Sequence, residues 1–449
     1  SNTGAYGTHG LTVMSNAGSK TLPLYNKAPH LRFTGKAVYT NLPVPGAYRG
    51  YGATQGYFPL ETALDEVAEQ LGIDPVELRR MNHIRVGESS PIFEELGEGR
   101  KGVEQTVKSC ELATCLDVGV EHFRWAERKN QKKEDGPWRY GVGMSIMMQG
   151  SGIPLIDMAA ATMKMNDDGS FNLLIGATDI GTGSDTILGQ IAAEVLGVTL
   201  DEIIVYSSDT DMTPFDTGAY ASSTTYVSGM ATQKAAEAVH DQICEVAAAM
   251  LKVDKDSFTL DGGWAVSSEG KKASLADICR RAMYGADQFQ IGATASFVPE
   301  ESPPPFIANF CEVRVDVETG KIEVTDWLTA VDCGTPINPK TAEGQMEGAV
   351  INGIGYALTE EMQISGLGRV RNPDFFEYKI PGAKDLPPME IVLVDSYEPT
   401  GPMGAKSVAE IGINAPIPTI ANAVYDAVGV RLTETPFTPE RVLRAMGVM

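Results

Sequence analysis

A carboxylate ends a glycine-containing run near the C-terminus, Gly404-Ala405-Lys406-Ser407-Val408-Ala409-Glu410. A carboxylate beside a water molecule or a hydroxyl group can accept its proton and so act as a general base. The same side chain could instead form an ordinary surface ion pair with Lys406, which lies four residues earlier. Taken by itself, the run favours the ion pair.

Glycine-containing loops lead into predicted helices at four places, namely residues 46–52, 178–183, 331–336 and 404–412. A helix start offers unpaired backbone N–H groups and a partial positive charge, and glycine lets the backbone approach a ligand closely. Such an end can hold a phosphate, so four of them favour a large cofactor that carries a pyrophosphate. For any single loop, an ordinary turn between a strand and a helix is the alternative.

A fifth stretch, residues 216–225, consists mostly of small and hydroxyl side chains and precedes a long predicted helix. Small residues such as Ala221 and Ser222 leave backbone groups open to a ligand. The alternative is a simple N-capped helix, because Ser and Thr are preferred at that position.

Two of the glycine loops belong to an internal duplication. A predicted hairpin at 163–169 leads to the loop at 178–183 and a helix with Gln190, and a predicted hairpin at 313–320 leads to the loop at 331–336 and a helix with Gln345. Elsewhere, strand-like apolar runs alternate with amphipathic helices. The sequence therefore predicts an α+β fold with duplicated units of hairpin, glycine loop and helix.

Two segments interrupt this pattern and suggest boundaries. The run at 127–136 is charged and turn-rich, and the run Glu301-Ser302-Pro303-Pro304-Pro305 cannot continue a helix or a central strand. A chain of 449 residues is also too long for one ordinary core. We expect three segments, which are 1–135 with the Arg49 loop, 136–300, and 301–449 with Glu410.

The composition argues against two classes of partner. With 36 Lys and Arg against 59 Asp and Glu, the net charge is −23, which would repel nucleic acid and anionic membranes. No apolar run reaches the roughly 18–20 residues that cross a bilayer, and Ser1-Asn2 leads straight into a glycine-containing segment without a charged and apolar leader. We expect a soluble, cytoplasmic protein that binds neither nucleic acid nor a membrane.

The six cysteines include no Cys-x-x-Cys pair, and we expect them to be reduced. An iron–sulfur cluster or a structural zinc needs clustered thiolates, so such a centre would have to lie on a partner chain. The five histidines show no paired metal-ligand spacing either. We therefore expect the histidines to be structural.

Taken together, the runs at 46–52, 179–183, 332–348 and 404–410 resemble the molybdenum subunits of the xanthine dehydrogenase and aldehyde oxidase family, in the family's own order. The resemblance implies a molybdenum–molybdopterin cofactor, either as molybdopterin or as its cytosine dinucleotide. It implies that the metal is bound by the pterin dithiolene, so no protein side chain is expected to be a metal ligand. It also implies iron–sulfur and FAD centres on partner subunits, which carry the electrons away.

The same resemblance implies roles for particular residues. Glu410 would be the catalytic base, and Arg49 and Tyr51 would contact the substrate, although both could instead be buried structural residues. The implied cofactor contacts are Gly150, Gly181, Thr182, Gly183, Ala221, Ser222 and Gln345. The implied reaction oxidises a C–H bond of a purine-like N-heterocycle or an aldehyde, with water as the oxygen source and Glu410 activating that water.

This sequence departs from the family pattern in three respects. Thr182 stands where many relatives have glutamine, and the family's molybdenum subunit begins well upstream, so an N-terminal portion would have to complete the site. We therefore expect the isolated chain to fold without molybdenum and to be inactive. Purine-specific relatives carry an arginine upstream of the Arg49 run, whereas this region has only Lys20, which lacks the planar fork of arginine.

Three other functions are alternatives. A nucleotide-binding module would need a third glycine where Thr186 stands, and a hydrolase elbow fails because Met147 occupies its last glycine position. A non-catalytic fragment that serves as an interaction subunit and needs a companion chain is the third, and it remains open.

Overall fold

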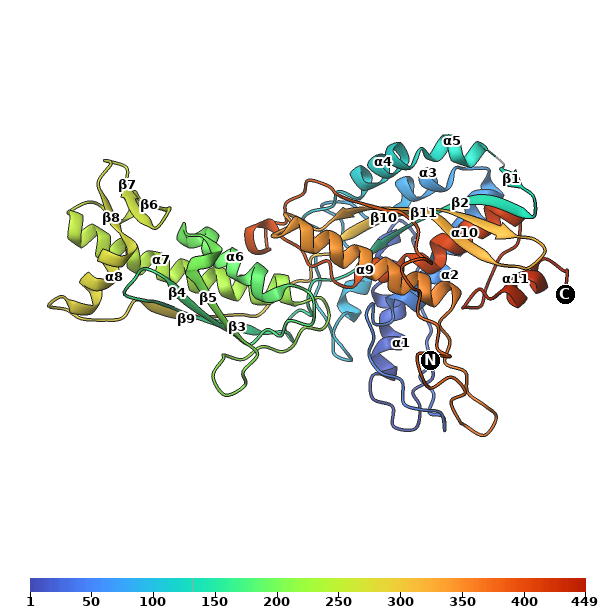
Figure 1. The fold of residues 1–449 in the computed structure, drawn as a ribbon, viewed down its shortest axis with the longest axis horizontal. Coiled ribbons are helices and arrows are strands. Elements are labelled where there is room, and N and C mark those ends of the chain that lie inside the picture. Colours follow the sequence, from blue (N-terminus) through green and yellow to red (C-terminus); the bar gives the residue numbers. More distant parts are fainter. Residues whose placement is uncertain (132) are drawn as a thin grey trace.

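The computed structural model describes residues 1–131 and 133–449, and it forms a large lobe and a small lobe (Figure 1). The small lobe, in green and yellow, comes from the middle of the chain, whereas both ends of the chain lie in the large lobe. Among the described residues, no helix is both long enough and apolar enough to cross a bilayer.

The small lobe contains a four-stranded sheet covered by two long helices, with a three-stranded sheet at its far end. Its elements are β3 (Ala159–Met165), β4 (Phe171–Ile175), α6 (Ser184–Leu196), β5 (Ile203–Ser207), α7 (Gly229–Leu251), β6 (Phe258–Asp261), β7 (Trp264–Ser267), β8 (Lys272–Ser274), α8 (Leu275–Tyr284) and β9 (Gly292–Phe297).

The large lobe contains a five-stranded sheet with helices on its faces. Its elements are α1 (Gly10–Ser19), α2 (Ala53–Leu71), α3 (Pro75–Asn82), α4 (Leu112–Phe123), α5 (Trp125–Asn130), β1 (Glu134–Asp135), β2 (Trp138–Met148), β10 (Phe306–Asp316), β11 (Ile322–Asp332), α9 (Pro339–Leu358), β12 (Met389–Leu393), α10 (Pro416–Val428) and α11 (Pro439–Ala445).

The two main sheets repeat one topology, so the predicted α+β fold with duplicated units is confirmed. The strand order is β9-β3-β4-β5 in the small lobe and β2-β10-β11-β12 in the large lobe. In each unit an antiparallel hairpin is followed by a helix, a strand parallel to the second hairpin strand, and another helix.

Each hairpin pairs with the strand that precedes the other hairpin in the chain. Strand β2 leads into β3 but pairs with β10, and β9 leads into β10 but pairs with β3. The backbone therefore passes twice between the lobes, once between β2 and β3 and once between β9 and β10. This exchange holds the loops of the two units against each other.

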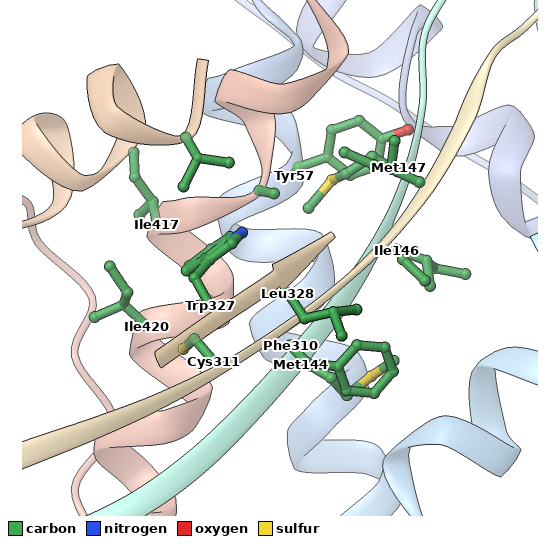
Figure 2. Packing of buried hydrophobic residues seen from close by; sticks show 14 of the residues in the cluster. Tyr57, Met144, Ile146, Met147, Phe310, Cys311, Trp327, Leu328, Ile417 and Ile420 are labelled. Carbon is green, nitrogen blue, oxygen red and sulfur yellow. The ribbon is translucent and has the colours of Figure 1, made fainter. Parts of the chain in front are cut away.

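One part of the core of the large lobe lies between its sheet and α10. Trp327 is fully buried and donates from Nε1 to Thr329 Oγ1 at 2.8 Å, while Ile417 and Ile420 lie beside it (Figure 2). Close packing of α10 on β2 requires glycine, because a Cβ atom on Gly143 would lie 2.2 Å from the Thr419 carbonyl oxygen. A short 3-10 helix, Ile411–Asn414, leads into α10, and Glu410 is the residue before that helix, so the position of α10 helps to fix Glu410.

A buried ion pair fixes α2, whose preceding loop carries Arg49. Glu61 and Arg79 are both fully buried, and Arg79 Nε lies 2.7 Å from Glu61 Oε2. The same carboxylate oxygen accepts from the Ile146 amide at 3.0 Å, which ties α2 and α3 to strand β2. Such a pair is strongly destabilising when only one partner is removed.

The packing divides the chain differently from the three predicted segments. One hydrophobic cluster combines residues from 1–135 and 301–449 with strand β2, and the other consists of residues between 159 and 291. The run at 127–136 also contributes to α5 and β1, and its Lys132 lies outside the described residues. The three segments therefore remain a proposal about domains.

Candidate active site

A cavity of about 960 Å³ lies where the two lobes meet. Seven of the ten predicted site residues line it, namely Arg49, Tyr51, Thr182, Ala221, Ser222, Gln345 and Glu410. The remaining three are close by. Gly150 lines a small second pocket that shares Lys20, Glu98, Ile153 and Ala221 with the cavity, while Gly181 and Gly183 flank Thr182.

The Glu410 carboxylate is held by two distant parts of the chain. Its Oε1 accepts from the Gly50 amide at 3.2 Å, and its Oε2 accepts from the Ser222 hydroxyl at 2.9 Å. The side chain is half-buried in the cavity wall. Each oxygen keeps a free lone pair, so the carboxylate is oriented and can still accept a proton.

Lys406 does not pair with Glu410, so the surface ion pair favoured by the run alone is wrong. The Lys406 ammonium lies 2.9 Å from both carboxylate oxygens of Asp332, and both side chains are fully buried. This pair anchors the start of the segment that carries Glu410. Lys406 therefore does not neutralise the Glu410 carboxylate. The sequence contained no local sign of it, because the partner lies on another element 74 positions away.

Arg49 connects the Glu410 segment to α9. Its Nη2 donates to the Gln345 carbonyl oxygen at 3.0 Å and to Gln345 Oε1 at 2.9 Å, while its Nε donates to the Ala409 carbonyl oxygen. Burial lowers the pKa of Arg49 and the nearby Glu410 carboxylate opposes that shift. In this structure the guanidinium therefore orients Gln345 and the residue before Glu410.

Gln345 in turn reaches the small lobe. Its Nε2 donates to the Gly181 carbonyl oxygen at 3.1 Å, which leaves one of its two N–H groups free. Hydrogen bonds thus run from Ala409 through Arg49 and Gln345 to Gly181, across both lobes. Two side chains predicted from separate motifs act together in one network.

Tyr51 forms part of the wall next to Glu410. Its hydroxyl group bonds to His9 Nδ1 at 2.8 Å and to Thr12 Oγ1 at 2.5 Å, both from the region of α1. Burial raises the pKa of Tyr51, and the carboxylates of Glu98 and Glu410 act in the same direction. The phenol is therefore a fixed neutral side chain that presents its ring to the cavity.

The loop before α2 can fold this way only because glycine follows Tyr51. Gly52 has a φ of +91°, and a Cβ atom there would lie 2.2 Å from the Val13 carbonyl oxygen of α1. We expect Gly52→Ala to lower stability by about 2–4 kcal/mol, because it adds a backbone clash to the strain of the positive φ. Thermal unfolding followed by circular dichroism would measure the loss.

Gly87→Ala is the matched control for that prediction. Gly87 has a φ of +82°, but a Cβ atom there would meet nothing within 4 Å, so only backbone strain is added. We expect about 1 kcal/mol for this variant. Equal losses in the two variants would contradict a tight contact between Gly52 and α1.

The loop at 179–183 is closed by its own carboxylate. Asp179 Oδ1 accepts from the amides of Gly181, Thr182 and Gly183 at 2.8, 3.0 and 3.2 Å. These amides are therefore not open to a phosphate, which differs from the simplest expectation for a glycine loop at a helix start. The polar groups that this loop offers the cavity are side-chain hydroxyls.

Ala221 and Ser222 adopt the left-handed conformation, with φ values of +53° and +54°. Two consecutive residues of this kind are strained and persist only where the surroundings fix them. The Gly152 amide donates to the Ala221 carbonyl oxygen at 2.9 Å, and a short π-helical turn, Thr224–Ser228, follows before α7. The strained turn directs the Ser222 hydroxyl onto Glu410.

The arrangement of these loops agrees with one protein family. The sequence model of the molybdopterin cofactor-binding domain matches residues 119–387, and a second model of the same description matches residues 1–83. The chain belongs to the molybdenum cofactor-binding subunits of the xanthine dehydrogenase and aldehyde oxidase family. The recognition made from the glycine motifs is thereby confirmed.

Individual relatives of this family are similar over nearly the whole chain. A probable hypoxanthine oxidase from Escherichia coli (strain K12) is 39% identical over 447 residues, which is 99% of this chain and 46% of that protein. A xanthine dehydrogenase molybdenum-binding subunit from Escherichia coli O157:H7 is 38% identical over 98% of this chain and 58% of its own length. The chain thus spans about half the length of these curated relatives.

Solved structures show the same fold. Quinoline 2-oxidoreductase from Pseudomonas putida 86 has a TM-score of 0.89 at 26% identity, covering 97% of this chain and 57% of that one. An aldehyde oxidoreductase from Desulfovibrio gigas has a TM-score of 0.83 at 26% identity, covering 99% of this chain and 46% of that one.

Unpaired polar groups in the cavity fit the family's cofactor. The hydroxyls of Thr182, Ser184 and Ser407 are buried and have no hydrogen-bond partner in the described structure, and all three residues line the cavity. Buried hydroxyls normally have a partner. A pterin or phosphate rich in donors and acceptors would supply partners for these groups and for the free N–H of Gln345.

Sequence reasoning missed several residues of this site. Asn338 Nδ2 donates to Gln190 Oε1 at 3.2 Å and joins the two duplicated units, and Glu98 and Ser407 line the cavity. Asn338 could have been found, because asparagine followed by proline is a helix-start signal and its side chain caps α9. Glu98 and Ser407 carry no comparable local signal.

Proposed function

We propose that this chain forms the base-carrying half of the active site of a molybdenum hydroxylase. The proposed reaction converts a C–H group of an N-heterocycle or an aldehyde into C–O, with the oxygen derived from water. The observation that carries the proposal is the Glu410 carboxylate, oriented by Gly50 and Ser222 in a cavity with unpaired hydroxyls.

The cofactor, when bound, supplies the oxidising centre and activates the water that provides the oxygen. Glu410 accepts the proton of that water on a carboxylate oxygen, while the Gly50 amide and the Ser222 hydroxyl keep the carboxylate in place. Arg49 holds the backbone next to this base and orients Gln345 toward the small lobe. Tyr51 provides a flat apolar surface for the substrate ring.

For the cofactor we propose contacts from Thr182, Ser222, Gln345 and the Ala221 backbone, with Gly150, Gly181 and Gly183 shaping the wall around it. The proposed cofactor is molybdopterin or its cytosine dinucleotide, and part of it would lie near α6. Thr182 and Ser184, both on the cavity wall there, would lie against its polar groups.

We propose that partners complete this half-site. They would be the N-terminal portion of the molybdenum subunit and chains that carry iron–sulfur and FAD centres, as the family resemblance implied. The strongly exposed side chains Leu367, Phe375 and Phe376, at 87%, 84% and 83% exposure, support a protein partner because all three belong to the segment between α9 and β12. We also propose a cytoplasmic location, with all six cysteines reduced as they are here.

The origin of the product oxygen tests this function. The complete molybdenum subunit, purified with its partner chains, would be given quinoline, hypoxanthine or benzaldehyde in water enriched in ¹⁸O. We expect the oxidised product to carry a labelled oxygen, and mass spectrometry would measure it. Label taken from ¹⁸O₂ gas instead, or no oxidation of either substrate class by molybdenum-loaded enzyme, would reject the proposal in favour of a non-catalytic interaction subunit.

A further inference from the structure

Asp157 is a buried carboxylate next to residues that line the cavity. Its residue is only 1% exposed, it lies just before strand β3, and the neighbouring Ile156 lines the cavity. Its Oδ2 accepts from the Ile153 amide at 2.7 Å. Its Oδ1 is also buried, and within the described parts of the chain it accepts no hydrogen bond of ordinary geometry. A buried carboxylate oxygen without a donor is costly, so a donor near it is strongly attracted.

The Tyr220 hydroxyl is such a donor, and it comes from the turn that carries Ser222. Burial raises the pKa of Tyr220 to about 12, and the interaction with the Asp157 carboxylate acts in the same direction. Tyr220 lines the cavity and is 47% exposed. Asp157 therefore holds the polar end of a side chain whose ring borders open space.

The Tyr220 turn needs such a restraint. Tyr220 directly precedes Ala221 and Ser222, the two consecutive residues in the strained left-handed conformation, and such strain persists only where the surroundings fix it. On one side of this turn, the Gly152 amide donates to the Ala221 carbonyl oxygen at 2.9 Å. Asp157 joins the same two segments, because it binds the amide that follows Gly152 and the side chain that precedes Ala221.

The strength of this link depends on the charge of Asp157. Burial raises the pKa of Asp157 to about 6, and the nearby Asp216 carboxylate acts in the same direction, while the Ile153 amide, the Tyr220 hydroxyl and the Lys20 ammonium oppose the shift. Asp157 is therefore ionised above about pH 6 and neutral below it. A carboxylate is a stronger acceptor for a hydroxyl group than a neutral carboxyl group is.

We propose that Asp157 is a positioning residue for the reaction, which keeps the Ser222 hydroxyl on Glu410 by holding Tyr220 and the strained turn. Asp157 itself does not contact Glu410, whose oxygens accept from Gly50 and Ser222. When Asp157 becomes neutral, the turn is held less firmly and the carboxylate of Glu410 is less well oriented. This inference rests on the proposed function, because it concerns the base of the same site.

The first test is the pH dependence of Asp157→Asn in the complete, molybdenum-loaded enzyme with quinoline as the substrate. Asparagine keeps an acceptor for the Ile153 amide and resembles the neutral acid at every pH. The ratio of wild-type kcat to variant kcat should be close to 1 near about pH 5 and about 3- to 10-fold above about pH 7. Its midpoint should lie near pH 6. Titration of Glu410 is common to both enzymes and cancels in this ratio, and KM should change little.

The second test is Tyr220→Phe, which removes the hydroxyl group and keeps the ring. It should lower kcat at neutral pH by a similar factor of about 3- to 10-fold. Adding it to Asp157→Asn should cause little further loss, because both substitutions break the same link. Tyr206→Phe is the matched control, since the Tyr206 hydroxyl donates to Asp209 Oδ2 at 2.5 Å and neither residue lines the cavity. It should leave kcat unchanged.

Hydrogen exchange of residues 217–223 gives a measurement that does not depend on turnover. Exchange of this segment should be faster than in wild type in Asp157→Asn and Tyr220→Phe at neutral pH, and unchanged in Tyr206→Phe. Mass spectrometry of peptides from the complete enzyme would measure it.

Each contrary outcome is specific. A kcat ratio that does not vary with pH overturns the inference, and so does wild-type kcat in Tyr220→Phe or an additive loss in the double variant. An effect confined to KM would assign Tyr220 to substrate binding alone and also overturns it. Failure of the proposed function would look different, because Asp157 and Tyr220 would still control the exchange of residues 217–223 while neither heterocycles nor aldehydes were oxidised.

Discussion

Glu410→Gln is expected to lower kcat of the complete enzyme by about 10²- to 10⁴-fold, which is the usual contribution of a positioned general base. Glutamine has almost the same shape, its carbonyl oxygen can accept from the Gly50 amide, and the Ser222 hydroxyl can rotate to accept from its amide group. The substitution therefore removes the proton acceptor and little else. Steady-state kinetics per bound molybdenum would measure the loss.

Two measurements accompany this substitution. Molybdenum content and thermal stability should stay at the wild-type level, because Glu410 is half-buried and both of its hydrogen-bond partners are retained. Ser222→Ala, which keeps the carboxylate but removes one of its two donors, should reduce kcat by only about 3- to 10-fold, the effect of one hydrogen bond. Near wild-type turnover in Glu410→Gln would rule out Glu410 as the base.

The duplicated units could be predicted because their signals are local. Each hairpin, glycine loop and helix start is encoded within about 35 residues, and the periodicity of the apolar residues distinguishes strand from helix. The helix with Gln345 and the helix that ends at Gly429 formed where the pattern placed them. The exchange of β2 and β9 between the units could not be predicted, because either pairing satisfies the same local pattern.

The candidate site could be predicted only as a set of residues and not as a set of contacts. The motifs identified Arg49, Gln345 and Glu410 as site residues. They could not predict the hydrogen bonds that these residues form, because those bonds join positions 296 or 360 residues apart. The role of Asp179, whose carboxylate accepts hydrogen bonds from the amides of its own loop, was missed because the amides of a glycine loop were expected to be free to bind a ligand. Burial of Lys20 likewise depends on the packing of α1 against the loop after residue 46.

Lys406→Met is expected to destabilise the large lobe by about 3–5 kcal/mol, the usual effect of removing one member of a buried ion pair. The fully buried Asp332 would keep its hydrogen bonds from the Glu111 amide at 2.7 Å and the Gly334 amide at 3.2 Å, but it would lose its counter-charge. Lys406 also donates to the Ser109 carbonyl oxygen at 3.2 Å, so that acceptor would become unpaired. Native-state hydrogen exchange of strand β11 and of residues 404–410 would measure the change in opening free energy.

The controls for Lys406→Met separate charge from packing. Adding Asp332→Asn to Lys406→Met should recover a large part of the loss, because no uncompensated charge stays buried. Lys101→Met breaks an ion pair with Glu94 of the same 2.9 Å length, but the Lys101 side chain is 76% exposed, so no measurable change is expected. Because Lys406 begins the segment that ends in Glu410, the single variant should also lower kcat, and the double variant should restore it only partly. If Lys406→Met were as stable as wild type, the buried Asp332 carboxylate would not need Lys406 as its counter-charge.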